Sequence, residues 1–235
     1  MKSIIHKAET RGHANFGWLN SRHTFSFGQY YDPERVHFGM LRVLNDDVVA
    51  GGAGFPTHPH SNMEIVSIPL AGALAHKDST GTEKAIHTGE VQIMSAGSGI
   101  THSEYNASKT DEVNFLQIWV FPKEKDIKPR YDQKRFHPED RKNKLQTVVA
   151  PNDNSALWIN QDAWFCLVDF DHEGVLDYSL RSANNGVYLF VIEGSVKIED
   201  TDLNKRDAIG IWETDQVHLK VQKDSQLLII EVPMN

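Results

Sequence analysis

Residues 52–72 read GAGFPTHPHSNMEIVSIPLAG and contain two histidines separated by one residue, followed by an apolar run. Side chains two positions apart on a β-strand point the same way, so His58 and His60 present their imidazoles from one face, about 6.6 Å apart along the backbone. Residues 89–106 read GEVQIMSAGSGITHSEYN, in which His102 and Glu104 repeat this spacing. Two such pairs on neighbouring strands would form a four-ligand pocket for one metal ion.

Glycines precede both pairs, at positions 51, 52 and 54 and again at 97 and 99, and allow tight turns into the two strands. A second carboxylate competes with Glu104 for the site. Glu64 shares the parity of His58 and His60 if their strand continues, whereas a turn at residues 61–62 would reset that parity.

Turn residues recur about every ten positions and separate short runs rich in Val, Ile, Phe and Leu. The clearest runs are residues 38–45, 64–72, 113–121, 187–199 and 225–233. Helical periodicity is nearly absent, which predicts an all-β protein of sandwich or barrel type. Only short helical turns are expected, around residues 138–142 and 160–163.

Residues 123–144, KEKDIKPRYDQKRFHPEDRKNK, are highly charged and contain two prolines. Such a segment is typical of a connection between domains. The β-rich blocks on either side share an internal echo, IPLAGALAH (68–76) and FVIEGSVKI (190–198), which indicates a duplicated unit. We therefore predict a metal-binding barrel at 1–122, a linker at 123–144 and a second barrel at 145–235.

Composition excludes several classes of function. The formal charge of −8 argues against capture of nucleic acid, which requires clustered Lys and Arg. No apolar run approaches the roughly 20 residues of a membrane helix, and the opening residues lack a signal-peptide hydrophobic segment, so a cytoplasmic protein is expected. Cys166 is the only cysteine and lies in an apolar run, as a buried thiol would.

The segment HTFSF (23–27) alternates like a strand, which would place His23, Phe25 and Phe27 on one face. These aromatic residues would cap the open end of a barrel or, as the alternative, line a ligand cavity.

The remaining histidines are weaker candidates. His76 and His87 lie near turns and are expected in solvent, and His37 would be either an outer-sphere donor or a surface residue. His172 and His218 lie in the second block, which has no HxH pair, and they are expected to lack a carboxylate partner. The second barrel is therefore expected to bind no metal.

The first stretch resembles the first cupin motif through Gly52, His58, His60, Glu64 and Gly72. The second resembles the second cupin motif through Gly89, Gly97, His102 and Asn106. Together with HSEYN, RGHANFGWL (11–19) and HTFSF, these motifs make essentially the whole chain similar to the pirin family, in particular its bacterial quercetin 2,3-dioxygenase-like members.

This resemblance implies a bicupin fold with the metal held by His58, His60, His102 and Glu104, and it implies that Glu64 is not a ligand. Imidazole and carboxylate suit several ions. Fe(II) is expected, with Ni, Mn, Cu and Zn as alternatives. The implied activity is O2-dependent 2,3-cleavage of a quercetin-type flavonol with release of carbon monoxide, in which Glu104 would be a ligand at rest and the general base during reaction.

Two other functions stay open at this point. One is a non-enzymatic, metal-dependent and redox-sensing protein that regulates a transcription factor or a metabolic enzyme, as proposed for some pirin relatives. The other is a cupin isomerase or sugar-binding module, which would not need an open redox metal. The chain is expected to be a monomer whose ligands are small molecules, with a protein partner under the regulatory hypothesis.

Overall fold

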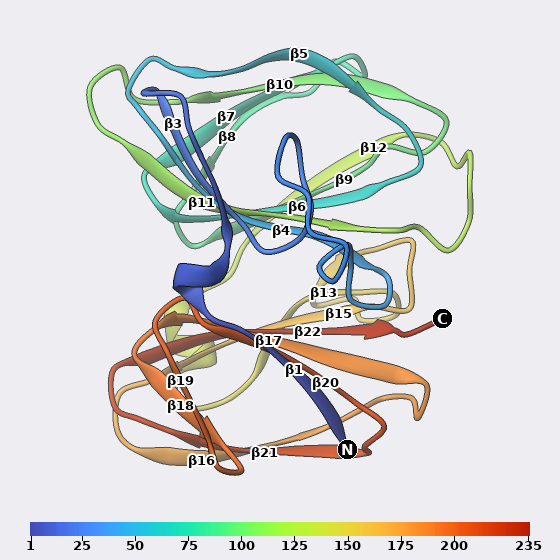
Figure 1. Cartoon of the computed structure of the whole chain (residues 1–235). Helices are drawn as coiled ribbons and strands as arrows, with labels where there is room; N and C mark the ends of the chain where they lie inside the picture. The colour runs from blue at the N-terminus through green and yellow to red at the C-terminus, as the bar shows by residue number, and fades with distance from the viewer.

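The computed structural model describes residues 1–235, which form two stacked β-barrels and only two short 3-10 helices, η1 (Ala8–Thr10) and η2 (Pro138–Arg141) (Figure 1). The prediction of an all-β protein with two cupin-type barrels is confirmed. Burial alternates along strands such as β10 (Ile100–Asn106), whose even-numbered residues are all buried. This alternation is what a strand with one face toward a barrel interior requires.

The N-terminal barrel consists of two facing sheets. The larger has the order β12-β9-β6-β11-β4-β3-β2 and the smaller the order β5-β10-β7-β8. Besides β10, their strands are β2 (Gly12–Asn15), β3 (Leu19–His23), β4 (Leu41–Val49), β5 (Gly54–His60), β6 (Glu64–Ala71), β7 (Ala73–Asp78), β8 (Glu83–His87), β9 (Glu90–Ser95), β11 (Val113–Val120) and β12 (Arg130–Arg135).

The C-terminal barrel repeats this arrangement, with a larger sheet β1-β20-β17-β22-β15-β13-β14 and a smaller sheet β16-β21-β18-β19. Its strands are β1 (Lys2–His6), β13 (Gln146–Ala150), β14 (Leu157–Trp158), β15 (Trp164–Phe170), β16 (Gly174–Ser179), β17 (Asn185–Glu193), β18 (Ser195–Ile198), β19 (Thr201–Asn204), β20 (Ala208–Trp212), β21 (Gln216–Val221) and β22 (Ser225–Pro233).

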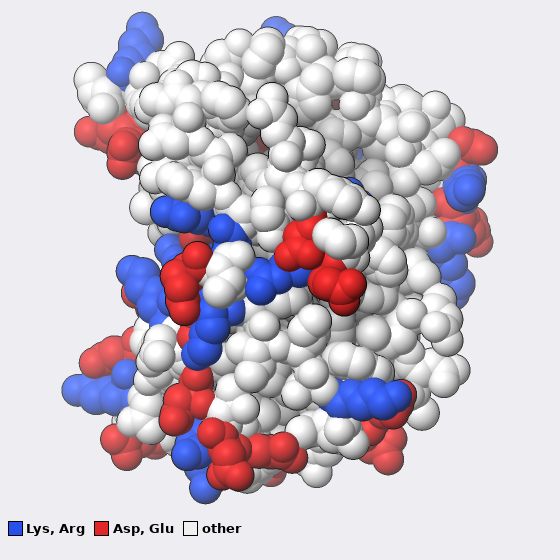
Figure 2. Space-filling view, viewed as in Figure 1, with Lys and Arg blue, Asp and Glu red and all other residues white.

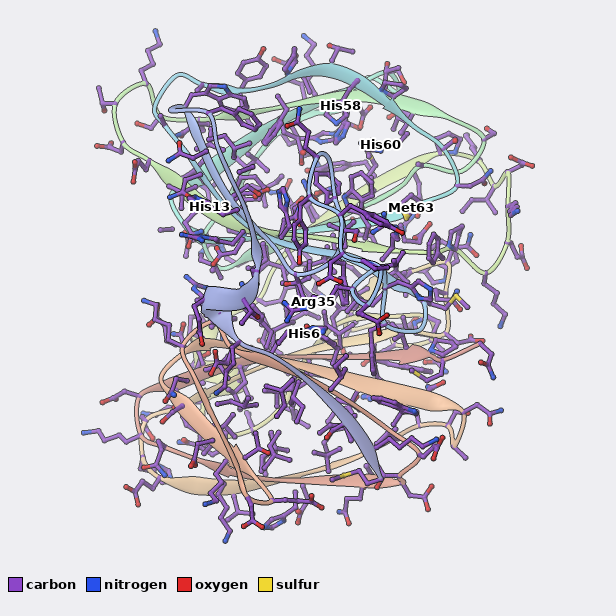
Figure 3. All side chains as sticks on the ribbon, viewed as in Figure 1. His6, His13, Arg35, His58, His60 and Met63 are labelled. Carbon is purple, nitrogen blue, oxygen red and sulfur yellow. The ribbon has the colours of Figure 1, made fainter.

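The two larger sheets face each other across a shared apolar core of 26 buried residues, contributed by both barrels. Phe25 and Phe38 from the N-terminal half pack there against Tyr188 of β17, with ring centroids 5.5 and 5.4 Å apart. His6 and Arg35 lie at the same junction (Figure 3). Because this core spans both barrels, the packing of each barrel stabilises the other.

The strand pairing differs from the predicted division of the chain at two places. β1 pairs with β20 of the C-terminal barrel, although 1–122 was predicted to be the first domain. β12 lies inside the predicted linker, 123–144, yet pairs with β9 along the edge of the N-terminal sheet. Charged residues suit an edge strand, because its outer side remains in solvent.

The segment 23–27 does not form the predicted strand. β3 ends at His23, so Phe25 enters the core between the barrels whereas His23 and Phe27 line a cavity inside the N-terminal barrel. The short helix expected at 138–142 appears as η2, residues 160–163 form no helix, and Cys166 is buried. No helix in the structure has the length and apolar character needed to cross a membrane.

Charged residues of both signs are interspersed on the face shown in Figure 2, where they gather around the junction of the barrels and along both edges. The central surface of the N-terminal barrel on this face is largely uncharged. No single-sign patch of the kind that binds a phosphate backbone is visible on this face.

Candidate metal centre

Two neighbouring strands of the smaller N-terminal sheet bring three histidines together. His58 of β5 lies directly opposite His102 of β10, and His60 follows His58 on the same face. Their ligand nitrogen atoms lie within 4.8 Å of one another, and the His58 and His102 ring centroids are 4.5 Å apart. Figure 3 shows His58 and His60 in the upper barrel. Period-two spacing on paired strands accounts for this convergence.

The surroundings of His60 and His102 favour their neutral forms, and a hydrogen bond orients His58. The Nδ1–H of His58 donates to the carbonyl oxygen of Pro56 at 2.8 Å, which leaves the Nε2 lone pair free. Burial, together with the neighbouring histidines, lowers the pKa of His102 to about 2 and that of His60 to about 4. Neutral imidazoles are the form that binds a metal ion.

Glu104 lies beside this trio rather than within it. A register shift between His102 and Glu104 in the pairing with β5 changes the path of the strand, and Glu104 groups instead with His76 and His102. Its carboxylate accepts hydrogen bonds from Gln117 Nε2 at 2.9 Å and from Ser67 Oγ at 3.5 Å. Burial raises its pKa to about 7.

His76 was expected in solvent, and this prediction is wrong, because His76 is only 1% exposed and points into the barrel from β7. Its Nε2–H donates to Asp78 Oδ2 at 2.8 Å, and its Nδ1 lies 3.4 Å from Nδ1 of His102. Leu74, His76 and Asp78 alternate with exposed or half-buried residues. The sequence signal was therefore the period-two pattern of ALAHKD, which the nearby turn obscured.

Glu64 lies outside both groups of metal-ligating side chains. It is buried on β6 in the larger sheet, where its Oε2 accepts hydrogen bonds from Ser95 Oγ at 2.8 Å and from the Asn160 backbone N–H at 3.1 Å. Asn160 lies between β14 and β15 of the C-terminal barrel. Glu64 therefore joins the two halves of the molecule.

The other histidines lie away from the centre. His37 Nδ1–H donates to the Gly39 carbonyl oxygen at 2.8 Å, and His87 is exposed. His172 and His218 were expected to lack a carboxylate partner, which is incorrect: they hydrogen-bond Asp171 and Asp177. These are exposed pairs of neighbouring side chains, of the kind that contributes little to stability.

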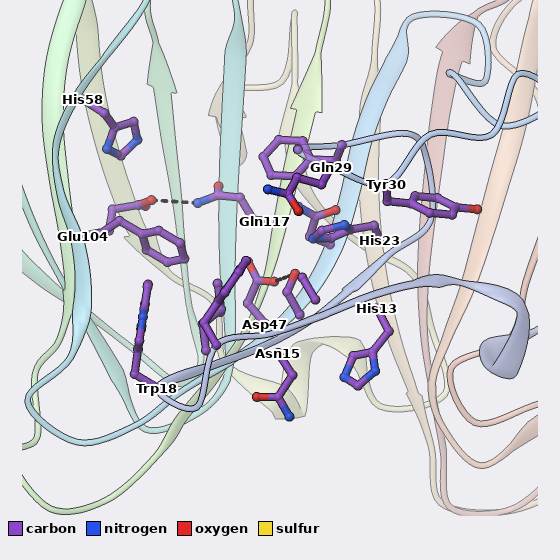
Figure 4. A pocket seen from close by; sticks show the side chains of 18 of the residues that line it. His13, Asn15, Trp18, His23, Gln29, Tyr30, Asp47, His58, Glu104 and Gln117 are labelled. Atoms are coloured by element: carbon purple, nitrogen blue, oxygen red, sulfur yellow. Dashed lines mark hydrogen bonds between the residues drawn. The ribbon is translucent and has the colours of Figure 1, made fainter.

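A cavity of about 710 Å³ opens beside the centre. His58 and Glu104 lie at one end, and His23 and Tyr30 at the other (Figure 4). Aromatic side chains dominate its walls, namely Phe16, Trp18, Phe27, Tyr30, Phe55 and Trp119. Its size and apolar walls match those of a site for a small organic molecule.

The donor set fits a divalent metal ion. Nε2 of His102 is buried and has no hydrogen-bond partner, an arrangement that is costly unless the lone pair is used. Imidazole nitrogens with a nearby carboxylate suit Fe, Ni, Mn, Cu and Zn. Two stacked barrels with an HxH pair and a later histidine on paired strands define a two-domain cupin protein with one metal centre.

Comparison with known proteins narrows this class. The model of the Pirin family matches residues 5–120, and that of the quercetinase C-terminal cupin domain matches residues 147–232. The quercetin 2,3-dioxygenase of Escherichia coli K12 is 41% identical over 97% of this chain and 98% of its own. A pirin-like protein of Caulobacter vibrioides is 37% identical over 94% and 95%. The chain belongs to the pirin family.

Solved structures support the same family assignment and fold. The crystal structure of the bacterial pirin YhhW from E. coli in complex with nickel(II) has a TM-score of 0.93, is 39% identical and covers 99% of both chains. An oxalate decarboxylase from Lactobacillus farciminis has a TM-score of 0.70 at 12% identity, which shows the fold alone.

Proposed function

We propose that this protein is a metal-dependent dioxygenase that cleaves quercetin-type flavonols between C2 and C3 and releases carbon monoxide. The observation that carries this proposal is the convergence of three imidazoles beside a buried carboxylate at the end of a cavity with aromatic side chains in its walls. The name of the E. coli relative supports the substrate class.

In this proposal His58, His60 and His102 hold one divalent ion, Fe(II), with Glu104 as a fourth ligand at rest. The YhhW structure contains nickel(II), and the same donor types accept both ions. A bound redox-active ion would stabilise the ionised flavonol hydroxyl and supply the electronic coupling to O2.

The side chains of the cavity have separate tasks. Trp18, Phe55 and Trp119 hold a flat ring system and exclude water. Glu104, which would be a ligand of the ion at rest, would accept the proton of the flavonol 3-hydroxyl as general base during the reaction. Gln117 and Ser67 hold the Glu104 carboxylate in position for this transfer.

Headspace measurement of carbon monoxide tests the function. Quercetin is added anaerobically to iron-loaded protein, oxygen is admitted, and carbon monoxide is compared with the flavonol consumed, with an iron-matched buffer as blank. Equimolar carbon monoxide is expected. Its absence would overturn the dioxygenase, and metal-dependent binding of quercetin without carbon monoxide would favour a regulatory binding protein.

The role of Glu104 is tested separately with Glu104→Gln. We expect loss of turnover even when iron is saturating, because an amide accepts no proton at neutral pH. Turnover that survives with the metal content intact would show that Glu104 is not the base.

A further inference from the structure

A row of polar side chains crosses the interior of the larger N-terminal sheet. Strand pairing places five buried residues directly opposite one another in the order Gln92, Ser67, Gln117, Asn45 and His23, on strands β9, β6, β11, β4 and β3. Two apolar clusters inside the same barrel, one including Phe115 and the other Ile65, lie on either side of this row. A polar band through a barrel interior is costly unless its hydrogen bonds are used.

The middle of the row, beside Glu104, is satisfied internally. Gln92, at one end, also has a buried Oε1 without a hydrogen bond, but it does not line the cavity. Gln117 Nε2 donates to Glu104 at 2.9 Å, and the one hydroxyl proton of Ser67 is shared between Gln117 Oε1 at 3.1 Å and Glu104 Oε1 at 3.5 Å. This part of the row orients the carboxylate, so its polarity needs no further partner.

The far end of the row lacks such partners. Asn45 Oδ1 and His23 Nδ1 are buried without any hydrogen bond, and the two residues are 2% and 5% exposed. Both line the cavity. The next pair on the same face is Ser21 and Asp47, in which Ser21 Oγ donates to Asp47 Oδ1 (Figure 4).

We propose that Asn45, Asp47 and His23 form a second recognition subsite, which accepts hydrogen bonds from phenolic hydroxyl groups on the ring of the ligand most distant from the metal. The proposal rests on the proposed function for the flavonol skeleton of that ligand. The subsite would bind the ring hydroxyl groups of the ligand that take no part in the reaction.

The chemistry of the subsite selects donors. The Asn45 oxygen and the Asp47 carboxylate are acceptors, and a phenol is a strong donor attached to a flat ring. The aromatic walls, which include Phe27 and Tyr30, provide the surface against which such a ring packs.

The spacing of the row suits an extended ligand. His23 lies two strands away from Gln117, and two strand spacings amount to about 10 Å, comparable to the length of two linked aromatic rings. A ligand whose chelating oxygens lie beside Glu104 therefore reaches the far end of the row with its last ring.

Binding to nickel-loaded protein under anaerobic conditions tests the subsite without turnover. Quercetin is compared with 3-hydroxyflavone, which keeps the chelating hydroxyl and carbonyl but lacks the other hydroxyls. Wild type should bind quercetin at least about tenfold more tightly, because 3-hydroxyflavone leaves buried acceptors unpaired.

Asn45→Leu and Asp47→Asn should each reduce this preference severalfold and leave the affinity for 3-hydroxyflavone within about twofold. Asp132→Asn, on the exposed side of β12, is the charge-matched control and should keep the full preference. Circular dichroism establishes that each variant is folded, and if one of the two is not, the other carries the test.

Equal affinities of wild type for the two flavonols, or no binding of either, would overturn the subsite, as would a full preference in the folded variants. A preference that depends on Asn45 and Asp47 supports it, even if the headspace assay finds no carbon monoxide. The binding comparison therefore tests the subsite, and the carbon monoxide assay tests the dioxygenase activity.

Discussion

His76 and His102 face each other through their Nδ1 atoms, 3.4 Å apart, and Nε2 of His76 is held by Asp78 at 2.8 Å. Because His76 carries its proton on Nε2, its Nδ1 is an acceptor, and the His102 tautomer that matches it has an Nδ1–H that donates to His76. That tautomer of His102 directs the Nε2 lone pair toward His58 and His60. Partners of this kind fix the orientation and basicity of a ligating histidine.

His76→Phe is therefore predicted to weaken binding of nickel(II) by about 10–100-fold, although His58, His60 and His102 are unchanged. Phenylalanine preserves the contact with Tyr131, whose ring centroid lies 4.6 Å from that of His76. Isothermal titration of metal-free protein measures the affinity. His87→Phe, at an exposed position of β8, is the control, and equal affinities of the two variants would exclude this role of His76.

Metal content should distinguish the two glutamates. Glu64→Gln is predicted to retain the metal of wild type, because Glu64 bonds to Ser95 and Asn160 rather than to the histidines. Glu104→Gln is predicted to lower nickel affinity at least about tenfold through loss of an anionic ligand. Elemental analysis after dialysis measures both, and loss of metal from Glu64→Gln alone would reverse the assignment.

Glu64 should also make stability depend on pH. Burial raises its pKa from 4.5 to about 7, so between these values the folded state keeps a proton that the unfolded state has lost. The free energy of unfolding therefore falls as pH rises through this window. Between about pH 5 and pH 8 wild type should lose about 2–3 kcal/mol more than Glu64→Gln. Urea denaturation at each pH measures this, and parallel curves would contradict it.

The shared core should make the two barrels unfold together. Phe38 is 5% exposed and packs against Tyr188 and Trp212. Phe38→Ala is predicted to cost about 3–5 kcal/mol in a single transition. Tyr31→Ala, at a side chain that is 74% exposed, should change stability by no more than about 0.5 kcal/mol. Two separate transitions in wild type would refute the coupling.

The local pattern was sufficient to bring the histidines together. His58, His60 and His102 needed only period-two spacing and the assumption that two strands are neighbours, which the pairing of β5 with β10 satisfies. The β-barrel class followed from short Val-rich and Ile-rich runs between turns.

The features that were missed depend on long-range pairing. β12 reads as a linker because an edge strand can be charged, and only its pairing with β9 reveals it. Asn45 carries no motif, and it joins His23 in one unit only because β4 lies between β3 and β11. The spacing of residues along one strand predicts which way their side chains point, whereas the identity of the neighbouring strand depends on the whole fold.

The pairing of β1 with β20 makes the halves of this protein difficult to separate by cutting the chain. A fragment of residues 1–122 would retain β1 without its partner strand. The complementary fragment, 145–235, would expose the backbone donors and acceptors of β20 along an open edge, which invites aggregation. The barrels look like a tandem duplication, but the polypeptide begins in the C-terminal barrel with β1, builds the N-terminal barrel and then returns. We therefore expect the entire chain to be the smallest unit that folds independently.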